Sequence, residues 1–110
     1  MAYQHQELAA GKWNKLTLME QLANVGSEVI RTINWRKKGN LPYSNRAFDR
    51  AIELLDLTIS DHKNIKRLRE LTRVREVLAD YFIFDNYYQS NAEQWERYFL
   101  AFNYAARLSN

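Results

Sequence analysis

Apolar residues recur every three or four positions through most of this chain, which is the spacing of one face of an α-helix. Few residues interrupt the pattern, because the 110 residues include one proline and three isolated glycines. Polar segments containing turn-forming residues separate the periodic stretches at 39–44, 60–64 and 84–90. The pattern therefore predicts an all-α protein, and the short connections favour a four-helix bundle of up-down-up-down topology.

The expected helices cover about 17–37, 44–59 and 91–107, and a further one lies in the stretch 67–82. Two of them begin with a capping-box pattern, in which two side chains satisfy free backbone donors of the first turn. These pairs are Thr17 with Glu20 and Ser90 with Glu93, while Ser44 is the expected N-cap of the second helix.

Gly26 lies inside the first expected helix, close to Ala23. A glycine there destabilises a helix by about 1 kcal/mol relative to alanine. Its presence indicates that another part of the protein approaches this helix closely.

Length and composition indicate one soluble domain over residues 1–110. The sequence is 46% hydrophobic and 26% charged, as in ordinary globular proteins. Residues 1–13 are expected to form a flexible tail or a short extra N-terminal helix. No apolar run approaches the roughly 20 residues that span a bilayer, and the first residues lack the pattern of a signal peptide. We therefore expect no membrane association and a cytoplasmic location.

Residue types that carry common chemistries are missing or isolated. The chain has no cysteine, which excludes disulfides, thiolate metal sites and cysteine nucleophiles. His5 and His62 have no histidine or glutamate one helical turn away, and no glycine-rich phosphate loop is present. We therefore expect no catalytic residues, no metal and no cofactor, and an enzyme is the least favoured class of protein.

A basic run lies between residues 62 and 75, where six basic residues accompany one acidic residue, Glu70. On a helical projection Lys66, Arg69 and Arg73 lie opposite the apolar face, which is typical of a solvated surface. The alternative interpretation is that these three residues bind nucleic acid or another polyanion. A second basic group, at the end of the first expected helix, would extend such a surface: Arg36, Lys37 and Lys38.

Arg75 does not fit the solvated face, because it projects among the leucines of the apolar side. An unpaired guanidinium cannot be buried there without a cost of several kcal/mol. We therefore expect Arg75 to meet Asp56 or Glu28 in a buried ion pair, or to line a site for an anion or another ligand.

Aromatic residues make up 14% of the chain, which is a high proportion. Trp35 projects to the polar side of the first expected helix, and with Tyr87 and Tyr88 it could form an exposed aromatic patch. Exposed rings of this kind are enriched in protein interfaces. We therefore expect a homo-oligomer, and a solution mass near the 13.1 kDa of one chain would contradict this expectation.

Three stretches carry a resemblance to known proteins: EQLANVGSEVIRTINWRKKGN, RAFDRAIELLDLTISD and RLRELTRVREVLADYF. They resemble a family of small prokaryotic all-helical proteins of similar length for which no activity is known. The resemblance implies a helical fold and assigns no functional residue. The hypothesis that we carry forward is a non-enzymatic module that associates with itself, and the alternative is a nucleic-acid or polyanion-binding protein.

Overall fold

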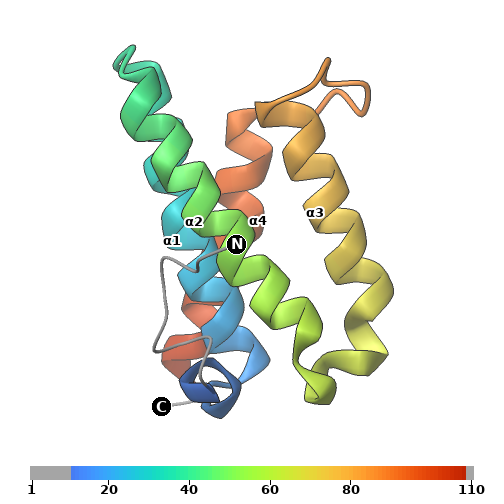
Figure 1. The fold of residues 1–110 in the computed structure, drawn as a ribbon. Helices are drawn as coiled ribbons and strands as arrows, with labels where there is room; N and C mark the ends of the chain where they lie inside the picture. Colours follow the sequence, from blue (N-terminus) through green and yellow to red (C-terminus); the bar gives the residue numbers. More distant parts are fainter. Residues whose placement is uncertain (1–10, 109–110) are drawn as a thin grey trace.

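The computed structural model describes residues 11–108 and contains four α-helices and two short 3-10 helices. The α-helices are α1 (Leu18–Lys37), α2 (Leu41–Ser60), α3 (Leu68–Phe82) and α4 (Ala92–Leu108). The 3-10 helices are η2 (Trp13–Lys15) and η3 (His62–Arg67). Consecutive α-helices run in opposite directions, so the predicted four-helix bundle is confirmed (Figure 1). No helix in the described part of the chain is both long and apolar enough to cross a membrane.

The two capping boxes are present, one of them displaced by a residue. At α1 the Thr17 hydroxyl accepts a hydrogen bond from the Glu20 amide, and the Glu20 carboxylate accepts one from the Thr17 amide. At α4 the same reciprocal bonds join Asn91 and Gln94. The predicted Ser90–Glu93 box is therefore wrong, because the asparagine that follows Ser90 takes the capping position.

The start of α2 also differs from the prediction. The N-cap is Asn40, whose side chain accepts from the Tyr43 amide at 3.1 Å, and Pro42 lies within the first turn. Proline is well tolerated there because its missing N–H has no intrahelical partner in any case. Ser44 lies inside the helix, is buried, and donates its hydroxyl to the carbonyl of Thr32 on α1.

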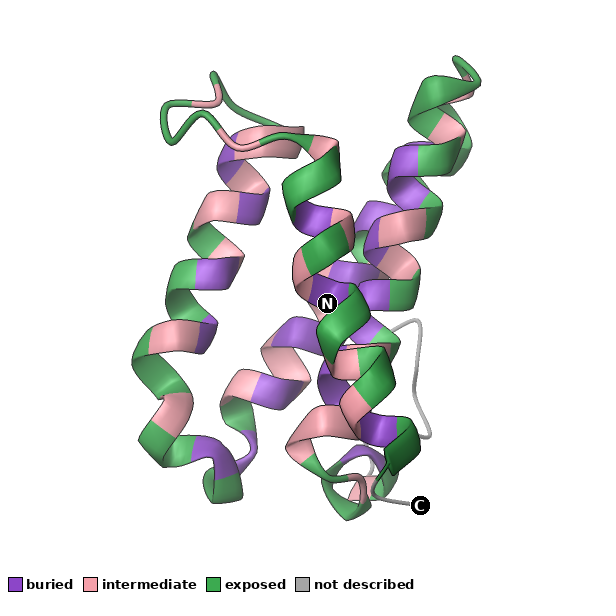
Figure 2. Cartoon of the chain, turned by 180° about the vertical axis from the view of Figure 1, so that it is seen from behind, coloured by how far each residue is buried: buried purple, intermediate pink, exposed green. Residues whose placement is uncertain are grey.

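Apolar side chains from all four α-helices form one core, and Figure 2 shows the buried residues on the sides that face one another. Helices α1 and α4 approach each other closely at Gly26. A Cβ atom added to Gly26 would lie 2.6 Å from the Cβ of Phe99, well inside any normal contact distance. The expectation of a close approach at Gly26 is confirmed.

A buried polar network closes the end of the bundle formed by η2 and η3. The Gln21 side chain donates to the carbonyl of Trp13 at 3.0 Å and to the carboxylate of Asp61 at 2.8 Å, and accepts from Asn64 at 2.8 Å. The Trp13 indole donates to the Thr58 hydroxyl at 3.1 Å. Trp13, the last residue of the expected flexible tail, is therefore part of the core, while residues 1–10 lie outside the described residues.

Candidate functional site

Arg75 pairs with Asp56, which was one of the two expected partners. Its Nε lies 2.6 Å from Asp56 Oδ1, and this hydrogen bond raises the pKa of the Arg75 guanidinium above its ordinary value. The expected burial is wrong, because the side chains of Arg75 and Asp56 are 42% and 46% exposed. The long arginine side chain follows the edge of the core and places its charged end in solvent.

Glu28, the other expected partner, binds two different arginines. One carboxylate oxygen lies 2.8 Å from Arg31 of the same helix, and the other lies 3.2 Å from Nε of Arg50 on α2. Glu28 therefore ties α1 to α2 and does not belong to the surroundings of Arg75.

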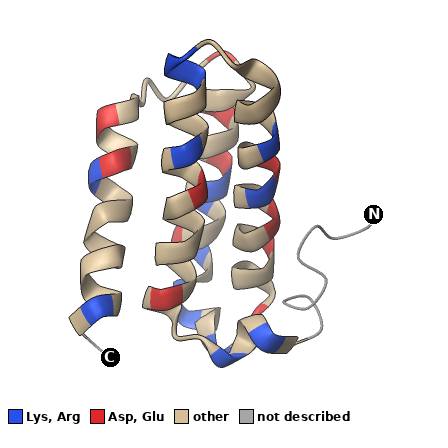
Figure 3. Ribbon diagram, turned by 90° about the vertical axis from the view of Figure 1, so that its left-hand side faces the viewer, with Lys and Arg blue, Asp and Glu red and all other residues tan. Residues whose placement is uncertain are grey.

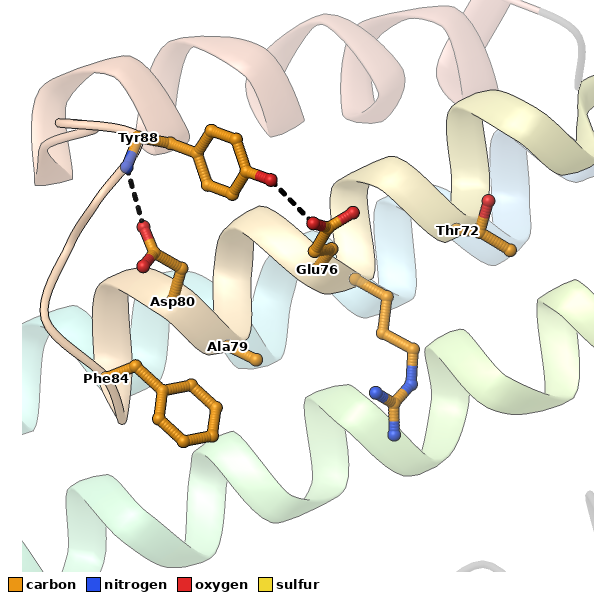
Figure 4. Close-up of a pocket in the computed structure, with 7 residues that line it drawn as sticks. Thr72, Glu76, Ala79, Asp80, Phe84 and Tyr88 are labelled. Atoms are coloured by element: carbon orange, nitrogen blue, oxygen red, sulfur yellow. Dashed lines mark hydrogen bonds between the residues drawn. The ribbon is translucent and has the colours of Figure 1, made fainter.

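An open hollow of about 410 Å³ lies beside Arg75, between α3 and the loop that follows it (Figure 4). Glu76 and Asp80 line it, and the Tyr88 hydroxyl reaches across to donate to Glu76 at 2.6 Å. This hydrogen bond raises the pKa of the Tyr88 hydroxyl. The hollow thus holds two carboxylates, and its arginine is already paired with Asp56, so its charge does not favour an anion.

Asp80 organises the loop between α3 and α4, a role that the sequence analysis missed. Its buried carboxylate accepts from the backbone amides of Tyr87 at 2.8 Å and Tyr88 at 3.0 Å. The turn requires left-handed backbone at Asn86 and Gln89. A signal was present, because a carboxylate in the last turn of a helix is unfavourable unless it has a specific partner.

The predicted aromatic patch is divided between two places. Trp35 packs edge-on against Tyr43, with ring centroids 4.9 Å apart, and contacts neither Tyr87 nor Tyr88 among the interactions of the described residues. Tyr87 and Tyr88 pack against each other in the α3–α4 loop, where Tyr87 is 83% exposed. Both groups belong to the same end of the bundle, at the top of Figure 1.

The predicted polyanion-binding residues do not form one surface. Lys66 belongs to η3, whereas Arg36, Lys37 and Lys38 lie at the end of α1, which is the opposite end of the bundle (Figure 1). Figure 3 shows acidic residues interleaved with basic ones along the helices.

Most of these cations also have partners within the chain. Arg73 lies over the ring of Tyr88, Arg36 lies over the ring of Tyr81, and Lys37 pairs with Glu96 at 3.4 Å. Lys66 and Arg69 are exposed on the surface of η3 and α3. The arrangement provides no continuous basic groove along α3.

The outer face of α4 carries an apolar stripe that the sequence analysis also missed. Leu100, Tyr104 and Leu108 follow one another at intervals of four residues and are 60%, 65% and 70% exposed. Leu100 and Tyr104 border a shallow surface hollow together with Arg97 and Arg107. The opposite face of the same helix carries Trp95, Phe99 and Ala106, which are buried. Helix α4 is therefore apolar on two sides, and the rest of the chain covers only one of them.

The charges of α4 are concentrated at its ends (Figure 3). Glu93, Glu96 and Arg97 lie in the first two turns, and nine uncharged residues then precede Arg107. Glu93 and Arg97 form an exposed pair at 2.8 Å. Helix α4 thus has an acidic residue near its start, Glu93, and a basic residue near its end, Arg107.

No group of three potential metal ligands occurs within residues 11–108. The sequence matches no protein-family model, and comparisons with curated proteins and with solved structures find no match.

Proposed function

We propose that this protein is a non-enzymatic interaction module that associates with a second copy of itself through the outer face of α4. The observation that carries the proposal is the exposed apolar stripe of Leu100, Tyr104 and Leu108. Burying such side chains against a partner removes apolar surface from water, which is the main driving force of association.

The charge pattern of α4 favours a second copy in antiparallel orientation. In a parallel pair Glu93 would face Glu93 and Arg107 would face Arg107, so like charges would repel. In an antiparallel pair centred on Leu100, Glu93 of each copy lies level with Arg107 of the other, because both are seven residues from the centre. The opposed helix dipoles also favour this orientation.

The pair would have twofold symmetry, the commonest form of soluble homo-oligomer. From Glu93 to Arg107 the segment of α4 that would pair is about 21 Å long at about 1.5 Å per residue. A single helix face of this length buries less than the roughly 1,600 Å² of a standard interface. We therefore expect a reversible dimer whose population depends on protein concentration.

Light scattering on the intact chain tests the proposal. We expect the mass of the wild-type protein to rise with concentration from 13.1 kDa towards twice that value. Leu100→Glu should keep the protein monomeric, since it places a charge at the centre of the proposed antiparallel contact. The matched control is Ile65→Glu on η3, because Ile65 is 57% exposed and Leu100 is 60% exposed.

Ile65→Glu should associate like the wild type. A wild-type mass that stays at that of one chain at all concentrations would contradict the proposal. Equal loss of association in both variants would show that the effect is not specific to α4.

A further inference from the structure

A second surface, at the turn between α1 and α2, combines rings with cations and is separate from the stripe on α4. Trp35 of α1 and Tyr43 of α2 meet edge to face, with an interplanar angle of 81°. The Lys38 ammonium lies 5.1 Å from the centre of the Trp35 ring, and the Arg46 guanidinium lies 4.7 Å from the centre of the Tyr43 ring. Each ring therefore has a cation over it.

The tight turn between the helices creates this cluster. Gly39 ends α1 with a positive φ of 77°, which favours glycine, and Asn40 immediately caps α2. The last turn of α1 and the first turns of α2 are thus held side by side at the top left of Figure 1. A hollow of about 200 Å³ opens there, lined by Trp35, Tyr43, Arg46 and Arg50.

Two cations of this cluster, one at the hollow and one over the neighbouring Trp35 ring, remain available to a ligand. Arg50 is held by Glu28 at 3.2 Å. Lys38 and Arg46, in contrast, lie within 4 Å of no carboxylate of the described residues. Residues 35–50 contain five basic residues and one acidic residue, so the local charge is positive.

We propose that this cluster binds a nucleobase together with its phosphate. The guanidinium of Arg46 lies over the ring of Tyr43, and because it is planar it can also pack against a flat base. Lys38 supplies a point charge for the phosphate. At about 200 Å³ the hollow is smaller than the roughly 300–1,000 Å³ of pockets for drug-sized molecules, so it suits one ring and leaves the sugar and phosphate outside.

The same chemistry is present in a free mononucleotide and in a single-stranded nucleic acid. Fluorescence anisotropy with a short, fluorescein-labelled oligoadenylate measures binding of a single strand. Competition by the unlabelled strand, by adenosine monophosphate and by inorganic phosphate shows which of these ligands the site prefers. We expect adenosine monophosphate to compete better than inorganic phosphate, because phosphate alone cannot stack.

If the site serves mononucleotides, adenosine monophosphate and the unlabelled strand should compete equally well when both concentrations are counted per nucleotide. If it serves single strands, the unlabelled strand should compete at a much lower nucleotide concentration than adenosine monophosphate does. Equal competition by inorganic phosphate and adenosine monophosphate would overturn the proposal, as would the absence of any binding.

Matched variants test the assigned residues. Tyr43→Leu should weaken binding by at least about fivefold, because it removes the ring that holds the Arg46 guanidinium in place, whereas Tyr43→Phe should retain affinity because it keeps the ring. Arg46→Gln should weaken binding by at least about fivefold. Arg69→Gln removes the same charge from the exposed surface of α3 and should leave binding unchanged.

Circular dichroism shows whether each variant is folded, and Tyr43 is partly exposed, so its replacement leaves the core intact. Wild-type affinity in folded Tyr43→Leu or Arg46→Gln protein would overturn the assignment. An equal loss in Arg69→Gln would do the same, since it would show general electrostatic attraction and no defined site.

Discussion

At the scale of single residues, the buried carboxylate of Asp61 makes the stability of the fold depend on pH. Burial by itself would raise the pKa of Asp61, but hydrogen bonds from Lys63 and Gln21 outweigh it and lower the pKa below its ordinary value of 3.8. The ionised carboxylate therefore stabilises the folded state fully at neutral pH. This contribution is lost as the pH falls below about 3.8 and through the lower pKa of the folded state.

We predict that Asp61→Asn lowers the free energy of unfolding at neutral pH by about 1–3 kcal/mol, because it removes a charge that is hydrogen-bonded to Lys63 and Gln21. The difference between variant and wild type should shrink as the pH approaches about 3. Urea denaturation across this pH range measures the effect. The control is Asp85→Asn, because Asp85 is exposed in the α3–α4 loop. A difference that stays constant with pH would show that the charge of Asp61 is unimportant.

Arg75 shows what a helical projection can and cannot predict. The projection places its Cα on the apolar face of α3, and the partner Asp56 follows from the need for a counter-charge. It does not describe how far a long side chain extends, so the predicted burial was wrong. Because both groups are more than 40% exposed, the ion pair contributes little to stability.

At the scale of helices, the contact between α1 and α4 depends on the missing side chain of Gly26. Alanine would improve the intrinsic helix propensity by about 1 kcal/mol. The added Cβ would, however, lie 2.6 Å from the Cβ of Phe99, an atom next to the backbone that cannot move without moving α4.

We therefore predict that Gly26→Ala destabilises the protein by about 1–3 kcal/mol, as overpacked cores do. The matched control is Ser27→Ala, which changes the next, exposed residue of α1 and should be nearly neutral. Thermal denaturation compares the two variants. A higher melting temperature for Gly26→Ala than for the wild type would show that α4 can move away from α1.

The helices themselves were largely predictable from the sequence, and their ends were less so. Thr17 and Glu20 were identified because no better cap lies nearby, whereas Ser90 is followed by Asn91, and either residue can cap a helix. The 3-10 segment His62–Arg67 was not predicted, since its hydrogen bonds depend on Asp61 and on the buried Asn64. Such individual side-chain hydrogen bonds leave no periodic pattern in the sequence.

At the scale of the whole molecule, the surfaces that we propose as functional were the least predictable part. The sequence analysis did not identify the apolar stripe of α4, because periodicity identifies apolar residues without showing which of them the neighbouring helices leave uncovered. The turn cluster joins Trp35 and Lys38 of one helix end with Tyr43 and Arg46 of the next. Only Trp35 and Lys38 were predicted as site residues, and they were assigned to different surfaces.

The central claim is that two copies meet through antiparallel α4 helices, and disulfide formation tests it most directly. The chain has no cysteine, so a single introduced cysteine reports one position. In the proposed arrangement Glu93→Cys protein should cross-link rapidly with Arg107→Cys protein when the two are mixed, and slowly with itself. Ile65→Cys should form few cross-links. Preferential linkage of Glu93→Cys to itself, or linkage of the mixture no faster than that of Ile65→Cys, would contradict the claim.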